Sequence, residues 1–142
     1  MNHHSLLHIS LFEEGNYDYI IVPDAGAEKK LQKVSQLFDI PLIQASKIRD
    51  TKTGNIIRTE VYADWQELGN CKVLIIDDIC DGGRTFLELA KVLKEKDVEE
   101  IELFITHGIF ANGLDAMNVA GISKFYTLNN IFNLKDSRLI EL

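Results

Sequence analysis

The stretch of sequence that decides the fold reads VLIIDDICDGGRTF and covers residues 73–86. It begins with four consecutive apolar residues, which predict a strand buried on both faces of a sheet. Two adjacent acids and a glycine-containing loop come next. From Phe86 onward, apolar residues recur at positions i, i+3, i+4 and i+7, the stripe of an amphipathic helix. The stretch therefore predicts a strand, a polar loop and a helix in direct succession.

Short apolar runs and helical patterns alternate on both sides of this stretch. Helices are predicted from residue 27 to about 38 and near 113–119; further strands are predicted at 19–22, from 41, at 56–62, 101–105, near 125–126 and at 138–142. The polar segment 46–55 is expected to be a mobile loop. Apolar strands interleaved with helices predict an α/β fold, with a mostly parallel sheet and helices on both faces.

Length and composition fit one folded domain. The chain has 142 residues, of which 46% are hydrophobic and 26% charged. The formal net charge of -7 argues against broad nucleic-acid binding, which relies on a basic surface. Cys71 and Cys80 have no metal-ligand or disulfide-framework spacing, which favours reduced thiols. No signal peptide or membrane span is evident, so we expect a cytoplasmic protein without a membrane partner.

The loop after residues 73–76 has the chemistry of a sugar-phosphate site. Gly82 and Gly83 permit positive φ and close backbone approach, so that successive amides can point at an anion. The start of the following helix adds unpaired amides. Asp77 and Asp78 can accept hydrogen bonds from sugar hydroxyls or hold a hydrated divalent cation. Two adjacent acids that repel each other make a purely structural role less favourable.

Two neighbouring residues carry alternative interpretations. Arg84 at a helix N-terminus opposes the helix dipole, and a bound anion would reverse that effect; alternatively its side chain points into water. Thr85 and Glu88 form a capping-box pattern, with Thr85 as the N-cap. Capping and phosphate contact use the same helix end, so both interpretations stay open for Thr85.

Residues 73–86 resemble the phosphoribosyl-diphosphate (PRPP) binding signature of the type I phosphoribosyltransferase superfamily. In that signature, four apolar residues precede two acids, two apolar positions and then Asp-Thr-Gly-Gly-Thr. The chain matches it at the apolar run and at Asp77, Asp78, Asp81, Gly83 and Thr85. It departs at Gly82, where Thr is usual, and at Arg84, where a small residue is usual. A guanidinium is a strong phosphate partner and can replace the missing hydroxyl contact.

Three further segments are similar to ribose-phosphate diphosphokinases (PRPP synthetases). They are Pro-Asp-Ala-Gly-Ala at residues 23–27, Lys-Ile-Arg at 47–49, and Thr-His-Gly-Ile-Phe at 106–110. Alternative roles remain for each: Asp24 can cap the next helix, a Lys-x-Arg pair is often only solvated, and His107 can be a satisfied strand-end residue. The order and spacing of all four segments agree with those enzymes over nearly the whole chain.

The resemblance implies a role for each matching residue. Asp77, with Asp78 alongside, would bind the ribose hydroxyls, and Lys47 would be catalytic with Arg49 on the reacting phosphates. Asp24 would help to hold Mg²⁺, the implied cofactor. The residues that would wrap the 5′-phosphate are Asp81, Gly82, Gly83, Arg84 and Thr85. The implied reaction moves the diphosphate of ATP onto the anomeric hydroxyl of ribose 5-phosphate and releases AMP and PRPP.

The resemblance also bears on domains and partners. Residues 1–142 match one phosphoribosyltransferase-like domain, the C-terminal half of a ribose-phosphate diphosphokinase. We therefore expect activity to require an N-terminal half or a partner, with a homo-oligomer as the other form of association. Two alternatives remain: a stand-alone phosphoribosyltransferase that uses PRPP and a base, and a non-catalytic regulatory subunit.

Overall fold

The computed structural model of the chain describes residues 10–63 and 68–142. Residues 1–6, where the sequence lacks the pattern of a signal peptide, lie outside these ranges. The strands are β1 (Tyr19–Val22), β2 (Leu42–Arg49), β3 (Ile56–Val61), β4 (Lys72–Cys80), β5 (Glu100–Gly108), β6 (Ile122–Asn130) and β7 (Leu139–Glu141). The helices are the 3-10 turn η1 (Ala25–Ala27), α2 (Glu28–Phe38), α4 (Arg84–Glu95) and α5 (Asp115–Ala120), and residues 10–15 are also helical.

The strands form a single sheet with the order β3-β2-β1-β4-β5-β6-β7. Every neighbouring pair is parallel except β2 and β3. From β1 the chain first adds β2 on one side and later β4 on the other, so the order reverses between β1 and β4. In parallel α/β sheets, ligands bind beyond the carboxyl ends of the strands at such a switch point. The predicted fold class is confirmed.

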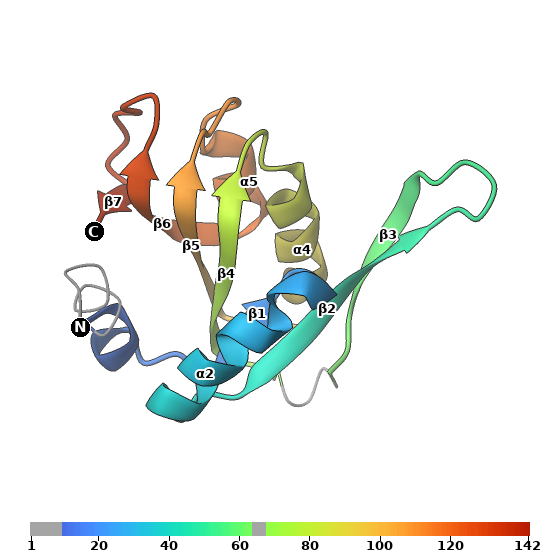
Figure 1. Cartoon of the computed structure of the whole chain (residues 1–142), viewed down its shortest axis with the longest axis horizontal. Helices are drawn as coiled ribbons and strands as arrows, with labels where there is room; N and C mark the ends of the chain where they lie inside the picture. The colour runs from blue at the N-terminus through green and yellow to red at the C-terminus, as the bar shows by residue number, and fades with distance from the viewer. Residues whose placement is uncertain (1–9, 64–67) are drawn as a thin grey trace.

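Helices cover both faces of the sheet, as predicted (Figure 1). On one face, Phe86, Leu89 and Leu93 of α4 pack with α5 against alternate residues of β1, β4 and β5. On the other face, α2 and residues 10–15 pack against the intervening residues of the same strands. Because side chains alternate along a strand, a strand buried on both faces is apolar along most of its length, and in β5 Glu102 departs from this pattern. The apolar runs in the sequence therefore marked these strands correctly.

Segment 46–55 was wrongly expected to be a mobile loop. Its first residues, Ser46 to Arg49, continue β2 and pair antiparallel with β3. The turn is confined to the next few residues, where Asp50 Oδ1 accepts a hydrogen bond from the backbone N of Lys52 at 2.7 Å. Gly54 supplies the positive φ of 74° that closes the turn. The strand is polar because this hairpin projects from the body of the sheet (Figure 1).

Helix α4 begins earlier than the capping-box pattern indicated. Gly83 occupies the N-cap position with a φ of 88°, and no side chain caps the helix. The prediction of Thr85 as N-cap is therefore wrong, because Thr85 already lies inside the first turn. Of the two loop glycines, only Gly83 adopts a positive φ. A left-handed residue starts this helix where a side-chain cap was expected.

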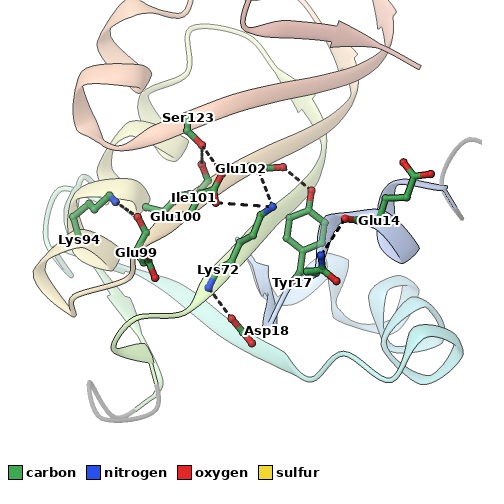
Figure 2. A network of polar contacts seen from close by, with 11 residues as sticks. Glu14, Tyr17, Asp18, Lys72, Lys94, Glu99, Glu100, Ile101, Glu102 and Ser123 are labelled. Carbon is green, nitrogen blue, oxygen red and sulfur yellow. Dashed lines mark hydrogen bonds and ion pairs between the residues drawn. The ribbon is translucent and has the colours of Figure 1, made fainter.

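A polar network joins the amino-terminal ends of the strands (Figure 2). Tyr17 donates a hydrogen bond to Glu102 Oε1 at 2.7 Å, and Lys72 Nζ lies 3.2 Å from Glu102 Oε2 as an ion pair. The Glu102 side chain is only 1% exposed. Burial opposes its ionisation, but hydrogen bonds from Tyr17 and Tyr126, aided by the charge of Lys72, hold the pKa of Glu102 below its usual value. This buried charge ties the segment before β1 to β4 and β5.

The Tyr17 hydroxyl should be the most sensitive part of this network. The variant Tyr17→Phe leaves a buried carboxylate without its donor, so we expect the free energy of unfolding to fall by about 1–3 kcal/mol in urea titrations. The control Tyr62→Phe removes a hydroxyl from a side chain that is 58% exposed. It should change the free energy of unfolding by less than about 0.5 kcal/mol. Equal losses in the two variants would contradict a stabilising role for the network.

Within the described residues, no helix has both the length and the apolar character needed to cross a bilayer.

Candidate functional site

The predicted site residues lie at the carboxyl edge of the sheet, around the β1/β4 switch point. Asp24 follows β1, Asp77 and Asp78 lie near the end of β4, and the glycine-containing loop connects β4 to α4. Lys47 reaches the same place from β2, where its Nζ donates a hydrogen bond to Thr85 Oγ1 at 3.0 Å. That contact joins side chains 38 positions apart in the sequence. The structure therefore brings the separate sequence motifs together.

The glycine-containing loop borders a cavity of about 310 Å³, which we call the cradle. Every residue predicted to wrap a 5′-phosphate lines it, together with Lys47 and Asp77. Position 82 has little room for a side chain, because a Cβ there would come within 3.1 Å of Asn112 Nδ2. Asn112 also donates a hydrogen bond to the carbonyl oxygen of Gly82 at 3.2 Å. The described walls of the cradle thus carry backbone amides, the two cations Lys47 and Arg84, and the two carboxylates Asp77 and Asp81.

Asp77 is the electrostatic centre of the site. Its carboxylate is half-buried, and burial raises its pKa above the usual value. The backbone amide of Asp78 donates to Asp77 Oδ1 at 2.8 Å and opposes that rise, whereas the charges of Asp24 and Asp78 reinforce it. Lys47 lowers the pKa through its positive charge. Three acids and one lysine therefore interact at the ends of β1, β2 and β4.

A second cavity, of about 370 Å³, lies on the α2 side of the sheet, and we call it the α2-side cavity. Asp24, Asp77 and Asp78 stand at its polar part, where Asp78 forms an ion pair of 3.2 Å with Lys30. Its remaining wall is largely apolar and includes Phe12, Leu31, Val34, Ile76, Phe104 and Leu128. Asp77 borders both this cavity and the cradle, so the two spaces meet at its carboxylate.

Several predicted residues occupy other environments. Asp24 does not cap α2, because its Oδ1 accepts a hydrogen bond from the backbone N of Gly26 at 2.9 Å and shapes the turn into η1. Arg49 donates to the carbonyl oxygen of Gly54 at 3.1 Å, within the hairpin. His107 accepts a hydrogen bond from the Asn129 side chain at 2.9 Å, if its Nδ1 is unprotonated. None of these contacts uses up all the polar atoms of the side chain.

Cys80 is a packing residue of the core. It is fully buried, and burial raises the pKa of its thiol to about 12. A thiol is a nucleophile only as thiolate, so Cys80 is inert at neutral pH.

The carboxylates fit a magnesium ion that is shared with a substrate. Within the described ranges, no three His, Cys, Asp or Glu side chains gather closely enough to hold a metal alone. Mg²⁺ is usually bound by one or two carboxylates together with substrate phosphates and waters. Asp24 and Asp77, which border one cavity, meet that smaller requirement.

Sequence reasoning missed three residues at this edge. Lys30 pairs with Asp78, and its position one turn into the helix after residues 23–27 could have indicated it. Asn112 and Arg58 carry no local signal, because one lies in an irregular loop and the other faces the site only through the hairpin. Their positions depend on pairings between distant segments.

The raised pKa of Asp77 predicts a specific dependence of stability on pH. The folded state binds this proton more tightly than the unfolded chain, so ionised Asp77 lowers stability at neutral pH. Without divalent cations, Asp77→Asn should therefore melt at a higher temperature than the wild type near pH 7. The difference should shrink as the pH falls through the raised pKa toward the usual value of 3.8.

Thermal unfolding between about pH 8 and about pH 4 tests this expectation. Asp81→Asn, which removes one charge from an exposed loop position, controls for the change in net charge. A difference between Asp77→Asn and wild type that stays constant with pH would contradict the assignment.

The chain is similar in sequence to known proteins. Residues 5–132 match the phosphoribosyl transferase domain family. A ribose-phosphate pyrophosphokinase of Mycoplasmopsis pulmonis is 30% identical over 115 residues, which cover 80% of this chain and 35% of that protein. Ribose-phosphate pyrophosphokinase 3, chloroplastic, of Oryza sativa is 34% identical over 93 residues, or 66% of this chain and 21% of that protein. The chain thus spans about a third or less of these two relatives.

Solved structures share the fold. The phosphoribosylpyrophosphate synthetase of Mycobacterium smegmatis superposes with a TM-score of 0.77 at 19% identity, over 100% of this chain and 46% of that one. APRTase of Giardia lamblia, crystallised with 9-deazaadenine, gives a TM-score of 0.70 at 13% identity, over 87% of this chain and 75% of that one. With the family match over most of its length, this chain belongs to the phosphoribosyl transferase domain family.

Proposed function

We propose that the chain is the phosphoribosyl-binding, C-terminal domain of a ribose-phosphate diphosphokinase. In this proposal, residues 1–142 form one domain that binds ribose 5-phosphate and PRPP and contributes to diphosphate transfer from ATP. The observation that carries the proposal is the hydrogen bond from Lys47 to Thr85, which places the hairpin cation against the glycine-containing cradle. The names of the curated relatives support the same activity.

In this proposal the cradle binds one part of the sugar phosphate and the acids bind another. The 5′-phosphate would lie against the backbone amides of residues 81–85, where Gly83 turns the chain into α4. The ribose hydroxyls would donate hydrogen bonds to Asp77, which borders the cradle. Asp78 lies on the α2 side of β4 and contributes from there. In this arrangement the anomeric hydroxyl would lie near Lys47.

The transfer itself needs charge neutralisation and alignment. The anomeric hydroxyl would release its proton to solvent as its oxygen attacks the β-phosphorus of ATP. The bond from that phosphorus to the α,β-bridging oxygen would then break, and AMP would leave. Lys47 and Arg49 project from the hairpin and would neutralise the charge on the transferred diphosphate. Asp24 with Asp77 would hold Mg²⁺, which supplies further positive charge to the phosphates.

Association and location complete the proposal. Because the chain spans about a third of its curated relatives, we propose that catalysis requires an N-terminal half or further copies of the chain. The thiol of Cys80 is free, which supports a reducing, cytoplasmic location.

Calorimetry tests the binding role. Titration with ribose 5-phosphate, PRPP and ATP, each with Mg²⁺, should give tight binding of the sugar phosphates and weak binding of ATP. The double variant Asp77→Asn/Asp78→Asn should abolish sugar-phosphate binding while remaining folded by circular dichroism. Sugar-phosphate binding that survives this double change would refute the site.

AMP release from ATP and ribose 5-phosphate tests the catalytic role. We expect turnover only when an N-terminal half is added, and Lys47→Gln should lower kcat by about 10²–10³ with little change in ribose 5-phosphate affinity. Binding without turnover in every mixture, unchanged by Lys47→Gln, would instead identify a regulatory subunit.

The α2-side cavity favours one alternative, a phosphoribosyltransferase that uses PRPP and a base. Its volume of about 370 Å³ and its apolar wall suit a small planar molecule, and Asp77 connects it to the cradle. Incubation with PRPP and a panel of bases, followed by diphosphate release, distinguishes the two reactions. Diphosphate release that requires a base and is blocked by Val34→Trp would favour the phosphoribosyltransferase. If no base causes diphosphate release, that alternative is excluded.

A further inference from the structure

Positive charge concentrates in a groove between the β2–β3 hairpin and α4. The groove measures about 590 Å³, and we call it the hairpin groove. Among the described residues, four cations and one carboxylate, Glu88, line it. That carboxylate lies 3.8 Å from Lys91 on the solvent side of α4. In a chain with a net charge of -7, such a local excess of cations indicates an anion site. The four cations are Lys47, Arg49, Arg58 and Arg84.

Most of these cations lack an acidic partner. Within the described residues, Lys47, Arg49 and Arg84 form no ion pair. Arg58 donates from Nε to Glu60 at 2.8 Å, which leaves its other guanidinium N–H groups available. Arg49 uses one N–H for the carbonyl oxygen of Gly54. Their remaining donors can therefore serve a ligand.

Arg84 connects the hairpin groove to the cradle. Together with Lys47 and Thr85, it lines both cavities. Its side chain is exposed and has no hydrogen-bond partner among the described residues. It also stands at the position where the PRPP signature usually has a small residue. The two cavities therefore share lining residues, among them a guanidinium without a described partner.

We propose that the hairpin groove is an oligophosphate-binding site, made continuous with the cradle by Arg84. Its ligands would be diphosphate or triphosphate groups, either free or carried by a nucleotide or sugar. Arg84 and Arg58 extend the set of phosphate contacts beyond Lys47 and Arg49. For the sugar phosphate beside the groove the inference rests on the proposed function, whereas binding of an oligophosphate alone does not.

Calorimetry with inorganic tripolyphosphate tests the groove directly, at about 50 mM salt and again at about 200 mM. We expect the wild type to bind, with an affinity that falls as salt rises. Arg84→Gln should weaken binding about tenfold or more, because it removes charge-assisted hydrogen bonds. Arg58→Gln should weaken tripolyphosphate binding more than ribose 5-phosphate binding.

Lys124→Gln is the matched control. It removes the same unit of charge from an exposed residue of β6 and should change tripolyphosphate affinity by less than about twofold. Thermal unfolding of each variant verifies that it is folded.

The outcomes separate this inference from the proposed function. The inference of an oligophosphate site is wrong if the wild type does not bind tripolyphosphate. It is also wrong if Lys124→Gln and Arg84→Gln weaken tripolyphosphate binding equally. The protein could bind tripolyphosphate through Arg84 and fail to bind ribose 5-phosphate. That result would support the oligophosphate site and refute the proposed function. The protein could instead bind ribose 5-phosphate while Arg84→Gln leaves its tripolyphosphate affinity unchanged. That result would support the proposed function and refute the oligophosphate site.

Discussion

The rest of the structure depends on the parallel hydrogen bonding of β4 between β1 and β5. Ile75 of β4 is in register with Ile21 on one side and Leu103 on the other. Because all three strands point the same way, every segment that follows them emerges at the same edge. β4 also continues beyond its apolar run to Cys80, so the acids at 77 and 78 belong to the strand itself. Their backbone positions are therefore set by the sheet and not by a loop.

The two edges of the sheet use charge in opposite ways. At the amino edge, Glu102 is buried among donors, with Tyr17 and Lys72 in direct contact (Figure 2). A buried charge is tolerated only with such partners. At the carboxyl edge, Asp77 is half-buried among other acids, and Arg84 has no described partner. The charges at the amino edge therefore stabilise the fold. The charges at the carboxyl edge remain available for a ligand to neutralise.

Local sequence signals predicted the strands and the helices α2, α4 and α5, because apolar residues recur with the period of each buried element. They did not predict the helix at residues 10–15, and they placed Asp77 and Asp78 after the strand although both belong to β4. They failed at the hairpin, where Lys47 and Arg49 lie on a polar strand whose pairing with β3 decides its conformation. They failed again at Thr85, because a left-handed Gly83 starts the helix two residues earlier than the capping-box pattern suggests. The roles of Arg58 and Asn112 arise from contacts across long sequence separations, which no local pattern encodes.

Gly83 has a consequence for how the phosphate loop can vary. A Cβ at this position would lie 2.9 Å from Met117 Sδ of α5, so the loop rests directly on a thioether. Methionine is the most adaptable of the apolar side chains, with three flexible bonds and a polarisable sulfur. The shape of the loop is therefore adjustable from beneath, through a buried residue that does not line the cradle. Substitutions at Met117 offer a route to retune phosphate selectivity while the chemical surface of the site stays intact.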